Sequence, residues 1–136
     1  MLIEGNFFTD NRGTVHFVND FHFEGIKRFY TFSHPDVSVI RAWQGHKIEL
    51  KHFYVTKGKF LICWMEIDNW DNPGRDLKVN RQILSEDDPQ VLVIQPGHAN
   101  GFKALEPDSQ LIVFSNLSLE EAKVDDYRFD SNFWAI

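Results

Sequence analysis

The sequence predicts an all-β fold, a sandwich or barrel built from many short strands. Turn signals recur at intervals of about 8–12 residues, which is typical of such folds. The helical segments that would join the strands of a parallel α/β fold are missing between the expected strands. Aromatic residues make up 15% of the chain, with 13 phenylalanines, and this residue type favours sheet.

The expected strands are runs of β-branched and aromatic residues bounded by turn signals. Asp10-Asn11-Arg12-Gly13 predicts a turn before the first of them, and Lys57-Gly58 predicts a tight hairpin turn. Only residues 119–128 have a helical composition, which predicts a short C-terminal helix. The expected strands cover residues 14–18, 27–32, 37–43, 52–55, 59–67, 77–84, 91–94, 98–102 and 110–115.

Length and composition predict a single domain over residues 1–136. The net charge of −6 and the lack of a basic run argue against a nucleic-acid partner. Cys63 is the one cysteine, so no disulfide forms within the chain, and its apolar surroundings predict a buried thiol. We see no signal peptide and no apolar run long enough to span a membrane, which predicts a cytoplasmic protein.

Gln44, His46 and Lys51 form the first group of candidate site residues. Gln44 and His46 are two positions apart, so they face the same side of a strand. A second group comes much later, in Pro96-Gly97-His98-Ala99-Asn100-Gly101-Phe102. The spacing of the two groups, with Gly58 after the first, resembles the two motifs of the cupin superfamily. The resemblance implies a double-stranded β-helix, or jelly-roll, barrel.

The cupin metal ligands are replaced in this chain. Gln44, Lys51 and Asn100 stand where that superfamily has histidine, glutamate and histidine, and only His46 is kept. Transition metals prefer imidazole and carboxylate ligands, and a lysine ammonium repels the ion. The sequence therefore predicts a protein without a metal, and no cofactor is expected.

Further motifs resemble two families of metal-free cupins that act on dTDP-sugars. Asp10-x-Arg12-Gly13 and Pro96-Gly97-x-Ala99-x-Gly101-Phe102 are similar to the dTDP-4-dehydrorhamnose 3,5-epimerases. Ile26-Lys27-Arg28-x-Tyr30, Arg41 with Gln44-x-His46-Lys47, and Asp126-Tyr127-Arg128 resemble the dTDP-sugar 3,4-ketoisomerases. The chain departs from the epimerases at the catalytic histidine and the tyrosine acid, where Gln44 and Val113 stand.

Both families remove a proton beside a ketone, which requires a base and a group that stabilises the enolate oxygen. The resemblance implies His46 as the base and Lys51 as the electrostatic partner of the oxygen, with Tyr30 either as a second acid or as part of the sugar pocket. Forked hydrogen bonds from arginine suit a diphosphate. The expected substrate-binding residues are Arg41, Arg12 and Arg28 for the diphosphate, with Gln44 and Asn100 for the sugar.

The sequence thus predicts an isomerase or epimerase of a dTDP-linked or related 4-keto-6-deoxyhexose, in deoxysugar or surface-polysaccharide biosynthesis. Epimerisation and 3,4-ketoisomerisation both stay open. The alternative is a non-catalytic cupin that binds a sugar or sugar nucleotide, which the residues at positions 44 and 113 favour. A homodimer is expected from the resemblance and because edge strands need cover.

Overall fold

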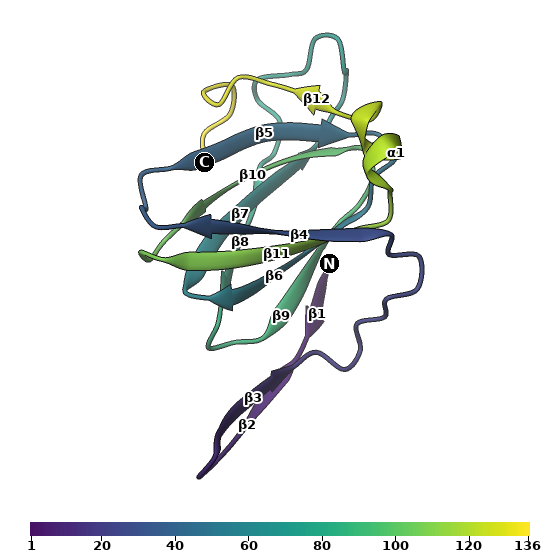
Figure 1. Cartoon of the computed structure of the whole chain (residues 1–136). Coiled ribbons are helices and arrows are strands. Elements are labelled where there is room, and N and C mark those ends of the chain that lie inside the picture. Colours follow the sequence, from purple (N-terminus) through teal and green to yellow (C-terminus); the bar gives the residue numbers. More distant parts are fainter.

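The structure, a computed structural model, describes residues 1–136 as two antiparallel sheets that face each other (Figure 1). The first sheet has the order β1 (Leu2–Glu4), β9 (Gln90–Ile94), β6 (Lys51–Lys57), β11 (Ser109–Ser115) and β4 (Arg28–His34). The second has the order β12 (Tyr127–Arg128), β5 (Ile40–His46), β10 (His98–Ala104), β7 (Lys59–Glu66) and β8 (Asn80–Ser85). The predicted all-β, jelly-roll fold is confirmed.

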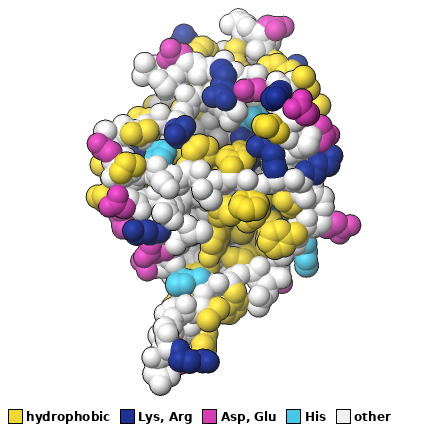
Figure 2. All heavy atoms as spheres, in the orientation of Figure 1, with side chains coloured by type: hydrophobic (Ala, Val, Ile, Leu, Met, Phe, Trp, Pro, Cys, Tyr) yellow, Lys and Arg dark blue, Asp and Glu magenta, His cyan; other side chains and the backbone are white.

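A hairpin of β2 (Asn6–Asp10) and β3 (Gly13–Phe17) projects away from this body (Figure 1). Its turn lies at the predicted Asp10–Gly13 position, and Gly13 has a φ of 128°, which favours glycine. Phe7, Phe8 and Val15 are half or more exposed on it, and Figure 2 shows apolar side chains along its length. The hairpin therefore has no packing partner within the chain.

The structure differs from the predicted elements in several places. Strands β1 and β2 were not expected, and the strands expected from residues 37 and 77 begin at Ile40 and Asn80. The helix α1 (Leu119–Lys123) ends five residues early. It begins with a capping box between Ser118 and Glu121 and ends before residues 127–128 pair with β5. This pairing replaces the last turn of the expected helix with a strand.

The main core lies between the two sheets and consists of inward-facing residues of β6, β7, β8, β9, β10 and β11, with Phe32 of β4 packed against it. On each of these strands, alternate residues point inward, as the pleat requires. The buried core residues are Phe53, Val55, Phe60, Ile62, Leu84, Leu92, Ile94, Phe102, Ala104, Leu111 and Val113. The same inward faces carry Tyr30, Lys51 and Asn100 further along β4, β6 and β10, so polar residues continue where the apolar core ends.

A second core covers the outer face of β5, β10 and β7. Trp43, Cys63 and Met65 are buried there under the C-terminal segment, and the Trp43 indole donates to the carbonyl of Trp134 at 3.2 Å. Cys63 is buried and free, as predicted, and burial raises the pKa of its thiol. No helix in the structure has the length and apolar character needed to cross a membrane.

A β-bulge in β5 decides which of its residues face inward. Asn100 of β10 pairs with Gln44, but the next residue, Gly101, pairs with Ala42, so Trp43 has no partner on β10. Gln44 and Arg41 are three residues apart and would face opposite sides of a regular strand. Because Trp43 is the extra residue, both Arg41 and Gln44 point to the inside of the barrel.

Candidate functional site

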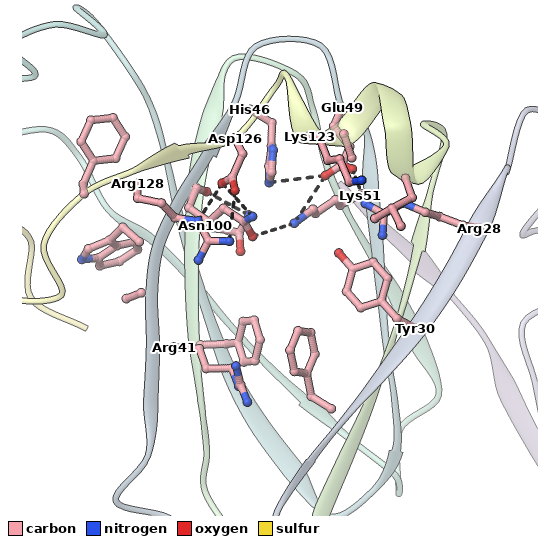
Figure 3. A pocket seen from close by; sticks show the side chains of 18 of the residues that line it. Arg28, Tyr30, Arg41, His46, Glu49, Lys51, Asn100, Lys123, Asp126 and Arg128 are labelled. Carbon is pink, nitrogen blue, oxygen red and sulfur yellow. Dashed lines mark hydrogen bonds and ion pairs between the residues drawn. The ribbon is translucent and has the colours of Figure 1, made fainter.

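A cavity of about 700 Å³ opens between the sheets beyond the main core (Figure 3). Strands β4, β5, β6 and β10 form its walls, and α1 with residues 126–129 lies along its rim. Seven of the eight residues predicted for the site line this one cavity. They are Arg28, Tyr30, Arg41, Gln44, His46, Lys51 and Asn100.

Arg12 is the predicted residue that the structure does not bring to the cavity. It lies at the tip of the β2–β3 hairpin, where its guanidinium pairs with Asp10 at 2.6 Å and its side chain is 84% exposed. The turn motif that carries Arg12 forms the end of a projecting hairpin, which is why one chain alone cannot place it near Arg41.

His46 lies at the end of β5 and is buried. Its Nδ1 is 2.7 Å from the backbone carbonyl of Asp125. A carbonyl only accepts, so Nδ1 carries the proton and Nε2 keeps its lone pair in the neutral ring. Burial first and Lys51 second lower the pKa of His46, while Glu49 opposes them. Burial thus lowers the pKa of His46 more than the nearby ammonium of Lys51 does.

Lys51 begins β6 and is also buried. Its ammonium donates to Oε1 of Gln44 at 3.2 Å and lies 3.4 Å from Oε2 of Glu49. Burial lowers the pKa of Lys51 to about 8, against the opposing effect of Glu49. The amine is therefore charged at neutral pH, yet close to losing its proton.

Glu49, which the sequence reasoning missed, lies between these groups. Its Oε1 accepts from Arg28 Nη2 at 3.0 Å and from the Ser115 hydroxyl at 2.9 Å. Its Oε2 lies 3.4 Å from both His46 Nε2 and Lys51 Nζ. The only sequence signal was its position three residues after His46. Glu49 lies in a turn between two expected strands, so strand spacing could not predict the side to which it points.

Tyr30 is the cross-strand neighbour of Val113, the position of the missing epimerase tyrosine. Directly opposed residues of an antiparallel pair lie on the same face, so Tyr30 brings a phenol close to that position from the adjacent strand. Burial and the Glu49 carboxylate raise the pKa of Tyr30 above its usual range, which keeps the phenol protonated. Arg28 lies over the ring, 4.9 Å from its centre.

The two amides differ in what they offer a ligand. Gln44 is bound at both ends, because its Oε1 accepts from Lys51 and its Nε2 donates to Asp126 at 3.0 Å. Asn100 donates from Nδ2 to the backbone carbonyl of Gln44 at 3.3 Å, which leaves its side-chain oxygen without a protein donor. Asn100 is therefore the amide with an unused acceptor in the cavity.

Arg41 lies apart from the acid–base residues, on the far side of the cavity in Figure 3. Its Nε donates to Nε2 of buried His34 at 3.0 Å, and its guanidinium lies over the Phe32 ring at 4.7 Å. Burial and Arg41 lower the pKa of His34, so this ring stays neutral and able to accept. Arg41 is the one cation of the cavity without a carboxylate partner.

The cavity is positive although the chain carries a net charge of −6. Five cationic side chains and two carboxylates line it, and Figure 2 shows basic side chains around its opening. The sequence gave no indication of Lys123, and it gave no role to Asp126 or Arg128, although Asp126-Tyr127-Arg128 had been noticed as a motif. Such a cavity attracts an anionic ligand.

The cupin metal positions come together around His46, but their side chains are Gln44, Lys51 and Asn100. No three histidine, cysteine or carboxylate side chains in the structure form a group suited to a metal ion. His98, the nearest other histidine in the second motif, turns back to the carbonyl of Gln95 at 3.0 Å and does not line the cavity.

Comparison with solved structures shows that the fold is that of the cupin-type dTDP-sugar epimerases and ketoisomerases. No protein-family model matches the sequence, and no curated protein sequence matches it either. The predicted resemblance is thus confirmed by fold.

Three of the similar structures show the range of sequence identity and structural similarity. The dTDP-4-dehydrorhamnose 3,5-epimerase of Sulfolobus tokodaii is 23% identical, with a TM-score of 0.78, over 99% of this chain and 79% of its own. A 3,4-ketoisomerase double mutant of Thermoanaerobacterium thermosaccharolyticum, in complex with TDP, is 18% identical, with a TM-score of 0.74 over 98% and 90%. The TDP-quinovose 3,4-ketoisomerase of Campylobacter jejuni is 19% identical, with a TM-score of 0.70 over 98% and 95%.

Proposed function

We propose that the protein is a metal-independent isomerase or epimerase of a nucleotide-linked 4-keto-6-deoxyhexose, in deoxysugar or surface-polysaccharide biosynthesis. The observation that carries this proposal is the cavity. It places a buried imidazole, a buried ammonium and a half-buried phenol together, and an arginine without a carboxylate partner apart from them, in the fold of the dTDP-sugar enzymes. Such an arrangement suits a substrate with a ketone at one end and a diphosphate at the other.

In the proposed reaction, Nε2 of His46 removes a proton from the carbon beside the ketone. The electron pair of the broken C–H bond moves to the carbonyl oxygen, and the ammonium of Lys51 stabilises the enolate. Return of a proton to the same carbon on the opposite face gives an epimer. Return of the proton to the former carbonyl carbon gives a 3,4-isomer, because the hydroxyl on the first carbon then becomes the ketone and its proton passes to the enolate oxygen. The phenol of Tyr30 is the second proton donor.

Arg41 is the proposed diphosphate ligand, because its terminal nitrogens are not engaged by a carboxylate and guanidinium binds phosphate oxygens as a fork. Asn100 is proposed to bind a sugar hydroxyl through its unused oxygen. Arg28 is already bound to Glu49 and to the carbonyl of Leu117, so its proposed contribution is to the charge of the cavity.

A second candidate is a non-catalytic cupin that binds a sugar nucleotide. Gln44, which replaces the epimerase histidine, supports it, since an amide cannot act as a base and here it is bound at both ends. Under this second candidate, the positive cavity would bind the sugar nucleotide without catalysing its isomerisation or epimerisation.

The decisive experiment follows the sugar protons of dTDP-4-keto-6-deoxyglucose by NMR in D₂O with the protein. We expect exchange at C3 or C5 that disappears in His46→Ala and persists in His98→Ala, whose ring lies outside the cavity. The product distinguishes epimerase from ketoisomerase. Binding without exchange would favour the non-catalytic cupin, and neither binding nor exchange would contradict both candidates for this nucleotide.

We also propose that the protein is a homodimer in which a second copy packs against the exposed β2–β3 hairpin. Phe7, Phe8 and Val15 give that hairpin an apolar surface with no cover in the chain. Under this proposal Arg12, at its tip, has a role in substrate binding only if it reaches the cavity of the partner.

A further inference from the structure

Two buried polar atoms of the cavity face each other without a hydrogen-bond partner. They are Nε2 of His46 and Oε2 of Glu49, 3.4 Å apart, and both side chains are at least 95% buried. Because Nδ1 of His46 donates to Asp125, Nε2 holds no proton in the neutral ring. Two acceptors therefore face each other. If Nε2 of His46 gains a proton, the imidazolium and the Glu49 carboxylate become a hydrogen-bonded ion pair.

Glu49 is fixed in this position from several sides. Asp125 accepts from the backbone N–H groups of residues 47, 48 and 49 at 2.7, 3.0 and 2.8 Å, which directs the Glu49 side chain inward. Arg28 and Ser115 occupy Oε1. Only Oε2 is left to face His46 and Lys51. One oxygen of the carboxylate therefore fixes the side chain in place, and the other faces the proposed base and the ammonium.

We infer that Glu49 is a positioning residue for proton transfer. Its carboxylate holds the Lys51 ammonium and accepts the hydrogen bond of the His46 imidazolium that forms when His46 takes the substrate proton. The inference rests on the proposed function. In this step the substrate C–H bond breaks, its proton goes to Nε2, its electron pair goes to the enolate oxygen, and Glu49 stays ionised throughout.

The physical need for such a residue comes from burial. A base in a dry pocket beside an ammonium is easily kept neutral, but its protonated form is then poorly stabilised. Glu49 offsets both effects, since its charge raises the pKa of His46 while burial and Lys51 lower it. A base with a pKa close to the working pH is the more effective one.

The charged and titratable groups around His46 define what the test must separate. On its own turn and on β6 these are Lys47, Glu49 and Lys51, and on β4 they are Arg28 and Tyr30. His98 is its backbone partner on β10, with the ring turned away. The segment that packs across the rim contributes Asp125, Asp126 and Arg128.

The test is the Glu49→Gln variant, which keeps the shape and removes the charge, with Glu66→Gln as a control that removes an exposed carboxylate outside the cavity. The first measurement is an NMR titration of the His46 ring proton, identified by its loss in His46→Ala. It needs no substrate. We expect the pKa of His46 to fall by roughly one pH unit or more in Glu49→Gln and to stay unchanged in the control.

The second measurement is the rate of proton exchange with the keto-sugar. We expect kcat to fall by about tenfold or more in Glu49→Gln, with its acid limb moved to lower pH and the Kd for dTDP within about twofold of the original. A carboxylate that only supported the fold would lower the melting temperature without moving the His46 titration.

Each outcome decides one question. An unchanged His46 titration in Glu49→Gln overturns the inference, and so does a moved titration with exchange as fast as in the control. If the unaltered protein shows no exchange, the proposed function fails, while the titration still decides whether Glu49 stabilises the His46 imidazolium. If Glu49→Gln does not fold, Glu49→Asp withdraws the charge by one methylene, and the pKa of His46 should move in the same direction by less.

Discussion

At the scale of single residues, His46 and Lys51 set the pH range in which the proposed reaction can run. His46 accepts a proton only when neutral, and burial with Lys51 holds its pKa below 6.5. Lys51 stabilises the enolate only when charged, and its pKa is about 8. We therefore expect kcat/KM to fall below the pKa of His46 and to fall again above about pH 8. Activity that keeps rising through the titration of Lys51 would contradict its role.

Arg41 gives a prediction about binding rather than chemistry. Its removal in Arg41→Met should weaken dTDP binding by roughly tenfold to a hundredfold, because a charge-assisted hydrogen bond is worth about 1.5–3 kcal/mol. Isothermal titration calorimetry measures the change. Lys103→Met is the matched control, since Lys103 is on β10 but does not line the cavity. Equal losses in both variants would mean that only net charge matters.

The sequence predicted seven cavity residues because strand spacing, supported by family motifs, is enough to place side chains on one face. Gln44 and His46 needed only the two-residue period. The presence of Arg41 on that face depended on the bulge at Trp43, which no local pattern indicates. Glu49 was missed because its partners, Arg28 and Ser115, lie 21 and 66 positions away and meet it only in the folded chain.

At the scale of elements, the turn between β5 and β6 depends on Asp125. Its buried carboxylate accepts three backbone N–H groups of residues 47–49. Removing the charge in Asp125→Ala leaves these donors unpaired, so we expect a loss of about 3 kcal/mol in the free energy of unfolding and a melting temperature lower by roughly 10 °C.

The control for this prediction is the neighbouring Asp126→Ala. Its carboxylate pairs with side chains at a partly exposed surface, through Arg128 and Gln44, so its loss should cost about 1 kcal/mol or less. Thermal unfolding followed by circular dichroism measures both. Similar melting temperatures for the two variants would show that the turn does not depend on Asp125.

Asp125 also explains why α1 ends five residues before the end of the predicted helix. Glu120, Glu121, Ala122 and Lys123 have helical composition, and the capping box starts the helix where expected. The sequence gives no local reason for the helix to stop at Lys123. It stops because Asp125 and residues 127–128 bind β5 and the turn after it, which are about 80 positions away in the chain. Hairpins such as Lys57–Lys59 were predicted well because Gly58, with a φ of 73°, is a local signal.

At the scale of the whole molecule, the projecting hairpin is the feature that one chain does not explain. Phe8 and Val15 are directly opposed on it, so they share one face, and they are 59% and 60% exposed. A second apolar area lies on the outer side of the first sheet, where exposed Phe23 and Phe29 pack around Phe114. Figure 2 shows apolar side chains on both the body and the hairpin. Exposed apolar areas of this kind are typical of protein–protein contacts.

If the hairpin is the interface of the proposed homodimer, replacing its exposed apolar residues with aspartate should separate the subunits. In Phe8→Asp/Val15→Asp, burial of two carboxylates in the interface would be strongly unfavourable, so light scattering at micromolar concentration should give the mass of one chain. The control is Val124→Asp, which adds a charge at an 82% exposed position after α1 and should stay dimeric. A monomeric unaltered protein, or a double variant that remains dimeric, would contradict the hairpin as the interface.

The same double variant also tests whether the nucleotide site is shared between subunits. If the monomeric variant keeps its affinity for dTDP, one chain supplies the whole nucleotide site. If it loses that affinity while its melting temperature is unchanged, the hairpin and Arg12 contribute to the cavity of the partner.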